Sequence, residues 1–237
     1  MTSRNASFYD SGVSGALFAP LKWIFCILML LLALVLAAWI VDWIFVFRVW
    51  PEGIRRLQAI LNEDLARTAR MGGGYYDLTR FALRTANVLY DGIFGITGIH
   101  DMGARFADGG ALSIPDTIAR NTYVANYQAI EVAMLGTQLF GIRLALFIAF
   151  WPLLLLAYVP ALADGLVQRA IRRAGGGNES ATIYHRAKYC QVVLMALLGA
   201  VCLLWPGAVD FRGIVLPGAA LLVLLARLQW AYYKKHL

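Results

Sequence analysis

One uninterrupted apolar run determines the solvent in which this chain folds. Between Lys22 and Asp42 stand nineteen residues without a charge, WIFCILMLLLALVLAAWIV. At about 1.5 Å per residue, this length matches the roughly 30 Å hydrocarbon core of a bilayer. A water-soluble helix does not need an apolar surface on all sides, so the run predicts a membrane span. Its length and the absence of a small-residue cleavage site favour a retained anchor over a cleaved signal peptide.

Three further stretches predict additional spans. Leu144 to Ala163 is free of charge, and so is the run from Tyr189 to Val209. Gly213 to Ala226 is shorter, but the residues up to Tyr233 extend it towards the interface. The composition, 60% hydrophobic and 15% charged, agrees with a polytopic membrane protein. We therefore expect an all-α fold with four transmembrane helices.

The chain divides at these runs. A long segment separates the first two spans, and a short basic segment separates the second from the third. In order, we expect a cytoplasmic tail (1–22), span one (23–47), an extracytoplasmic helical segment (48–139), span two (140–163), a cytoplasmic basic hairpin (164–188), span three (189–209), an outer turn (210–213), span four (214–233) and a cytoplasmic tail (234–237).

The lysines predict the orientation. All four lie beside expected span ends that share one side if the chain starts inside: Lys22, Lys188, Lys234 and Lys235. Short loops rich in Lys and Arg stay cytoplasmic, so both termini and the hairpin are placed there. Residues 48–131 contain nine Arg, nine acidic residues and no Lys, and this long segment can cross. The net charge of +7 is thus first a topology signal, and direct nucleic-acid contact is not expected.

The long segment shows helical periodicity. A helix is expected after Pro51, with apolar residues at helical spacing up to the break at Gly72. A second helix is expected from about Tyr75 to Tyr90, with Val88 among its inward-facing residues. The segment is too short to bury a core alone, so we expect a helical layer continuous with the membrane helices.

The remainder of that segment contains a glycine-rich stretch and a helix start. Asp91–Leu112 is expected to be a loop because of its glycines. The S-x-x-D capping pattern at Ser113 predicts a long helix that continues without a break through Arg143 into the second span.

No motif for catalysis, a cofactor or a metal stands out. The glycine triplets at Gly72 and Gly175 lack the spacing of a phosphate-binding loop. The three histidines are isolated, and the three cysteines, all in or at spans, lack metal-ligand spacing. We expect no catalytic, cofactor-binding or metal site, and no enzymatic activity.

The hairpin is the most specific local pattern. DGLVQRAIRRAGGGNESATIYHRAKY is typical of two helical arms around a glycine turn, with the arginines of the first arm on one face. Two roles remain open for its cations: contact with lipid head groups, or docking of an acidic or phosphate-rich partner. The candidate partner-binding residues are the cationic and aromatic side chains of both arms: Arg169, Arg172, Arg173, Tyr184, His185, Arg186 and Lys188.

Two charges are expected to meet near the outer interface. Asp42 stands about twenty residues beyond Lys22, and Arg143 about twenty residues before Asp164. Antiparallel spans therefore place both at similar depth, where a charge is costly unless it is paired, hydrated or snorkelling. We expect an Asp42–Arg143 ion pair, which would make the first and second spans neighbours.

The hairpin also resembles a known family. It is similar to the signature of membrane proteins encoded in integrating conjugative elements and some conjugative plasmids, in which a D-G-L-V-x-R-x-I/L-R-R arm precedes a Gly-rich turn, E-S and Y-H-x-A-K. Ala170 departs from that pattern, where the family commonly has an acidic residue. The matching residues are Asp164, Gly165, Leu166, Val167, Arg169, Arg172, Arg173, Glu179, Ser180, Tyr184, His185, Ala187 and Lys188.

The resemblance implies a functional context. It implies four spans in a bacterial inner membrane and a gene near the coupling-protein ATPase of conjugative type IV secretion. We therefore expect a scaffold or accessory subunit of a DNA-transfer apparatus, with membrane lipid and the coupling ATPase or other secretion subunits as partners. Self-association into a homo-oligomer is compatible with the sequence. The alternative is a small transporter or channel component, although the chain shows no internal repeat.

Overall fold

A computed structural model describes residues 6–71, 77–107, 114–176 and 181–233, and in these ranges the side chains from residue 22 onward except those of residues 103, 104, 107, 114–116 and 181. These ranges are helical and contain no strand, which confirms the expected all-α class. The elements are α1 (Ala6–Ile44), the π-helical turn η1 (Phe45–Val49), α2 (Ile54–Met71), α3 (Leu78–Tyr90), the π-helical turn η2 (Asp91–Gly95), α4 (Ile99–Ala107), α5 (Ile114–Ala125), α6 (Tyr127–Ala174), α7 (Ala181–Leu204) and α8 (Phe211–Ala231).

Four of the described helices are long and apolar enough to cross a membrane, as the charge-free runs predict. They cover Lys22–Val49, Tyr127–Ala174, Thr182–Leu204 and Phe211–Ala231. The third ends earlier than its charge-free run, because Trp205 precedes Pro206, and a residue before proline is biased away from helical geometry. The chain is therefore a membrane protein, with a short loop between α7 and α8.

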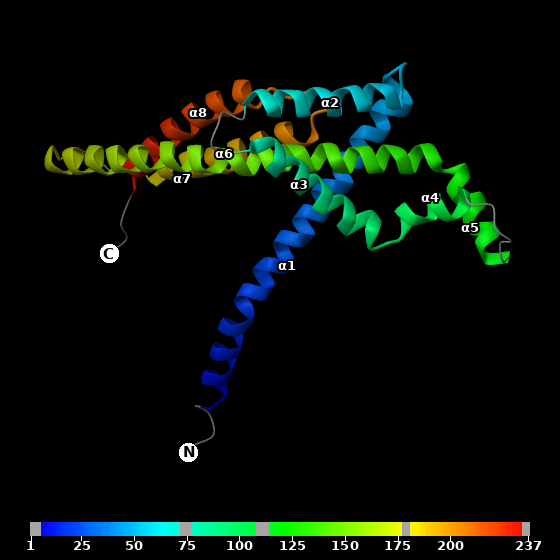
Figure 1. The fold of residues 1–237 in the computed structure, drawn as a ribbon. Helices are drawn as coiled ribbons and strands as arrows, with labels where there is room; N and C mark the ends of the chain where they lie inside the picture. The colour runs from blue at the N-terminus through cyan, green and yellow to red at the C-terminus, as the bar shows by residue number, and fades with distance from the viewer. Residues whose placement is uncertain (1–5, 72–76, 108–113, 177–180, 234–237) are drawn as a thin grey trace.

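α6 is the axis of the fold (Figure 1). α7 and α8 pack along its C-terminal half, and α2 and α3 lie along its N-terminal half. α1 crosses α6 and then diverges from the other helices towards its N-terminus (Figure 1). The side chains of 22–30, in the diverging part, are correspondingly exposed.

α1 and α6 are neighbours where they cross. Val35 and Ala38 of α1 are buried against Phe140 of α6. The indole Nε1 of Trp39 donates a hydrogen bond to Thr137 Oγ1 at 3.0 Å, which anchors the crossing. The first and second spans are thus adjacent, as expected.

The approach of α3 to α6 depends on a glycine. A Cβ added to Gly141 would lie 2.5 Å from the Cα of Ala86, closer than van der Waals contact allows. Ala82 and Ala86, both buried, form the α3 side of this contact. The expectation that Val88 faces inward is wrong, since its side chain is 64% exposed. Small residues define the buried face of α3 because backbone proximity leaves no room for larger ones.

Two other local expectations are corrected. The glycine-rich stretch Asp91–Leu112 is not a loop throughout, because η2 continues α3 and α4 follows it. Apolar residues at helical spacing predict this stretch better than its glycine content does, because burial of Phe94, which is 2% exposed, stabilises the helical conformation. The long helix expected through Arg143 is interrupted at Asn126, whose Nδ2 donates to the carbonyl of Thr122 at 2.9 Å. The expected cap at Ser113 lies outside the described residues.

Candidate functional site

Two clusters of polar residues, called here the first and the second group, stand at opposite ends of the uncharged part of α6. Arg143 precedes it, and Asp164 and Arg169 follow it. The 26 residues from Arg143 to Arg169 correspond to about 39 Å of helix, somewhat more than the hydrocarbon core of a bilayer. Each group is thus placed near one membrane surface, and each joins α6 to other elements.

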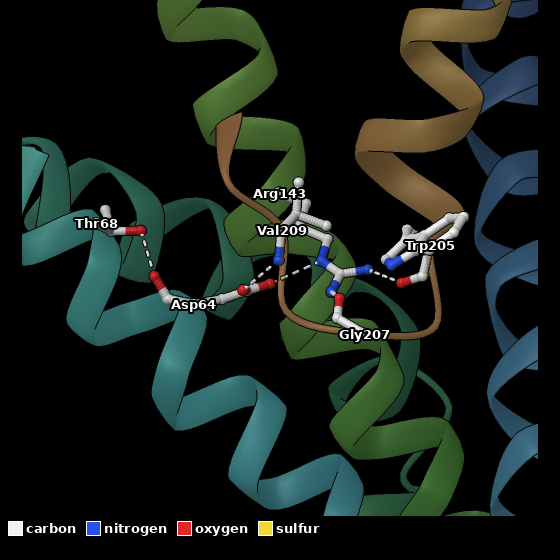
Figure 2. Close-up of polar contacts among 6 residues, drawn as sticks. All are labelled: Asp64, Thr68, Arg143, Trp205, Gly207 and Val209. Atoms are coloured by element: carbon white, nitrogen blue, oxygen red, sulfur yellow. Dashed lines mark hydrogen bonds and ion pairs between the residues drawn. The ribbon is translucent and has the colours of Figure 1, made fainter. Parts of the chain in front are cut away.

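The first group is a buried ion pair (Figure 2). Arg143 is 2% exposed, and its Nε donates to Asp64 Oδ2 at 2.9 Å. The two Nη groups donate to the backbone carbonyls of Trp205 and Gly207, at 2.5 and 2.6 Å. Asp64 Oδ1 in turn accepts the N–H of Val209 at 2.9 Å. One guanidinium thereby binds a side chain of α2 and the backbone of the α7–α8 loop.

This arrangement is that of a structural clamp. Both carboxylate oxygens of Asp64 accept hydrogen bonds, and Thr68 Oγ1 donates to the Asp64 backbone carbonyl at 2.7 Å. Buried charges are tolerated when they are paired and hydrogen-bonded in this way. Chemistry at Asp64 would require breaking these bonds. The clamp therefore fixes α2 and the α7–α8 loop on α6.

Asp42 lies beside this clamp. The side chain is 6% exposed and lines one pocket with Arg143 and Gly136. The Asp42 carboxylate fits against Gly136, where an added Cβ would lie 2.6 Å from its Oδ2. Arg143 forms its ion pair with Asp64 at 2.9 Å. The structure thus brings Asp42 and Arg143 together in one pocket, and their direct pairing stays a prediction.

Sequence reasoning missed the role of Asp64. The signal was available, since Leu57 and Ile60 mark the buried face of α2 and Asp64 follows on that face at helical spacing. The neighbouring Glu63, in contrast, has a local partner, because it pairs with Arg67 at 2.6 Å on the exposed side of α2. A carboxylate on the apolar face of a helix, far from any cation in sequence, indicates a long-range partner.

A phenol–imidazole contact joins α3 and α4. Tyr90 Oη lies 2.8 Å from His100 Nδ1, and the two rings meet edge to face. Burial raises the pKa of Tyr90, and nearby Tyr123 and Asp91 raise it further. The phenol therefore stays protonated at physiological pH and joins α3 to α4.

The second group is formed by the hairpin and the end of α8. The first arm is not a separate helix, because α6 continues to Ala174. The guanidinium of Arg172 lies 3.7 Å from the ring centroid of Tyr232 and donates to the carbonyl of Ala231 at 3.3 Å. That of Arg169 lies 5.0 Å from the ring centroid of Tyr233. Such stacked arginines fix the arm on α8 as well as carrying charge.

The seven predicted residues thus separate into two sets. Tyr184 packs edge to face on Tyr233 and belongs with Arg169 and Arg172 in the inward set. The other four are exposed on α6 and α7, and we call them the exposed basic face: Arg173, His185, Arg186 and Lys188. Glu179 and Ser180 of the motif lie outside the described residues.

The aromatic end of α8 was also missed from sequence. Trp230 Nε1 donates to Tyr158 Oη at 3.1 Å, and its ring packs against that of Tyr233. Trp and Tyr at a span end commonly mark the membrane interface, and that rule would have placed them beside the basic arm. Nearby, a Cβ added to Gly165 would lie 2.7 Å from the carbonyl oxygen of Arg227, so α6 and α8 nearly touch.

Neither group contains a metal-binding set. Among the described residues, no three His, Cys, Asp or Glu side chains are close enough together to hold a metal ion. The two groups are therefore described by what they join: the clamp joins α2 and the α7–α8 loop to α6, and the hairpin group joins α6 to α8.

Comparison with known families gives one match. The family model described as "IncC plasmid conjugative DNA transfer protein DtrJ-like" matches residues 49–234, which is most of the chain. Comparisons with curated proteins and with solved structures find no match. The matched range begins at the end of the first span and includes both polar groups.

Proposed function

Since the chain belongs to the DtrJ-like family of conjugative DNA transfer proteins, we propose that it acts as a non-enzymatic scaffold of the transfer apparatus in the bacterial inner membrane. Its role in conjugative DNA transfer and its membrane location form the premise. The finer proposal is that the exposed basic face docks an acidic surface of a secretion-system subunit, the coupling ATPase of type IV secretion first among them.

The observation that carries this proposal is the division of the hairpin cations. Arg169 and Arg172 pack on α8, so they hold the arm in place. Arg173 is exposed on the arm so held, and Arg186 and Lys188 are exposed on α7, whose Tyr184 packs on Tyr233 of the same α8 end. A rigid, positively charged surface favours electrostatic recognition of a negatively charged partner. The buried Asp64 carboxylate is engaged by Arg143 and Val209, which supports a non-enzymatic role.

The test removes charge from the exposed basic face alone. The triple variant Arg173→Gln/Arg186→Gln/Lys188→Gln keeps helix propensity and the α8 contacts. At about 0.5 kcal/mol for each exposed ion pair, three lost charges weaken docking by about tenfold. The measurement is recovery of the coupling ATPase by mild-detergent co-purification and mass spectrometry from cells carrying the whole transfer region, together with transfer frequency.

The matched control is Arg80→Gln/Arg84→Gln, two exposed charges on α3 at the other end of the bundle. It should leave recovery of the coupling ATPase unchanged. Normal transfer and normal recovery by a stably expressed triple variant would reduce the exposed basic face to a topology signal.

The proposal also requires a defined orientation. With the lysines inside, Gly176 faces the cytoplasm and Gly73 the opposite side. In a chain whose native cysteines are replaced, a membrane-impermeant thiol reagent should label Gly73→Cys but not Gly176→Cys in intact spheroplasts. The reverse labelling would place the hairpin outside and remove the coupling ATPase as its partner.

A further inference from the structure

A groove of about 410 Å³ opens between α6 and α8 beside the hairpin. Its walls combine long apolar side chains of α8 with polar side chains of both helices. It is lined by Gln168, Arg172, Leu224, Leu225, Arg227, Leu228, Ala231 and Tyr232. None of these residues belongs to the exposed basic face, so the groove is a separate feature.

The groove crosses the boundary between charged and apolar surface. Arg227 forms an ion pair with Asp164, the residue that ends the uncharged run of α6. This pair marks one level of the bundle as the polar edge of the membrane. Leu224 lies about one helical turn deeper than Arg227, and its side chain is 59% exposed. The groove thus has a cationic end at the polar edge of the membrane and an apolar wall deeper in the membrane.

The polar end of the groove carries two guanidinium groups, those of Arg172 and Arg227. Arg172 uses one N–H for the Ala231 carbonyl, at 3.3 Å, and stacks on Tyr232. A guanidinium carries five N–H donors, so donors remain beyond this bond. Asp164 offsets the charge of Arg227, whereas Arg172 and the adjacent Arg173 keep the local charge positive. Charge and shape together match a phosphate attached to an apolar chain.

The geometry points to a binding site for one anionic phospholipid in this groove. Its phosphate binds Arg172 and Arg227, and an acyl chain lies along Leu224 and Leu228. Basic pockets between membrane helices on the cytoplasmic side suit lipid head groups, and the volume is that of a small-molecule site. The site goes beyond partner docking, because it uses the groove-facing residues and holds α6 against α8.

The test uses the full chain in mild detergent and in phosphatidylcholine vesicles with or without phosphatidylglycerol. Native mass spectrometry counts bound lipid, and thermal unfolding measures stabilisation. We expect wild type to retain phosphatidylglycerol over phosphatidylcholine. Arg172→Gln/Arg227→Gln should weaken that binding by about fivefold for each arginine, about 25-fold together.

Two variants separate the groove from general charge. Arg186→Gln/Lys188→Gln removes two positive charges at the same end but outside the groove, and should bind phosphatidylglycerol within twofold of wild type. Leu228→Trp keeps both arginines and fills the apolar wall, so it should also lose the lipid. The Trp variant keeps the test decisive if the double arginine variant fails to fold.

Five results would overturn the site. Four of them are equal retention of phosphatidylcholine, equal weakening by the Arg186/Lys188 variant, full lipid retention by Leu228→Trp, and equal stabilisation by inorganic phosphate, which would indicate a free-phosphate site. Displacement of the lipid by an acidic peptide without loss of stability would equally assign the groove to a protein partner. Loss of coupling-ATPase recovery in the exposed-face variant is independent of each of these results.

Discussion

The Arg143–Asp64 clamp allows a quantitative prediction of energetic coupling. We consider Arg143→Met, Asp64→Leu and the double variant. Each single change leaves one charge buried without its partner, because both side chains are at most 2% exposed. The double change removes both charges and keeps apolar volume at the site. The three variants therefore form a double-mutant cycle that isolates the interaction.

The magnitudes follow from the groups that lose partners. Breaking a buried pair by removing one side chain costs about 3–5 kcal/mol, so two additive losses would total about 8 kcal/mol. The double variant buries no charge, but the N–H of Val209 and the carbonyls of Trp205 and Gly207 lose their partners. At about 1–2 kcal/mol each, these three groups cost about 4 kcal/mol. The expected coupling energy is thus about 4 kcal/mol.

The assay is reversible unfolding in mixed micelles, followed by tryptophan fluorescence. The control cycle uses Glu63→Gln and Arg67→Gln, an exposed pair on the same helix α2, for which coupling below about 1 kcal/mol is expected. Additive losses at Arg143 and Asp64, or a control coupling of equal size, would refute the clamp as the connection between α2 and the α7–α8 loop.

Two further predictions concern α6. Gly141→Ala pushes a methyl group into the backbone at Ala86 and should destabilise the protein by about 1–3 kcal/mol. The control is Gly199→Ala on α7, whose added Cβ meets nothing closer than 3.9 Å, so this variant should be neutral or slightly stabilising. Thermal midpoints in detergent compare the two variants. Asp42→Asn should couple to Arg143→Gln by about 1 kcal/mol, well below the clamp, because the two residues share a pocket while Arg143 binds Asp64. A coupling as large as that of the clamp would show Asp42 to be the true partner.

The membrane helices were predictable because hydropathy along a single helix determines them. The charge-free runs correspond to described helices, and the break expected at Gly72 lies outside the described residues. The stretch after Tyr90 is largely helical, although its glycine content predicts a loop. Phe94, buried at helical spacing from Tyr90, shows that the spacing was the better signal.

The partners of charges were much less predictable. Asp64 and Arg143 are 79 residues apart, and no local pattern relates them. The expected Asp42–Arg143 pair rests on equal depth, and depth alone does not choose between carboxylates at the same level. Likewise, helical spacing places Arg169 and Arg172 on one face but does not say that Tyr232 and Tyr233 cover it. Such choices depend on how helices pack.

The unbroken length of α6 has a mechanical consequence. Its 48 residues span about 72 Å, more than twice the hydrocarbon thickness, with no linker between the outer helices and the hairpin arm. Only Pro152 and Pro160 interrupt its internal hydrogen bonds, so bending is easiest between those two points. The helix therefore connects the clamp to the hairpin arm through a single segment at which it can bend. A tilt imposed where α2 is clamped reaches the arm only to the extent that the segment between the two prolines stays straight.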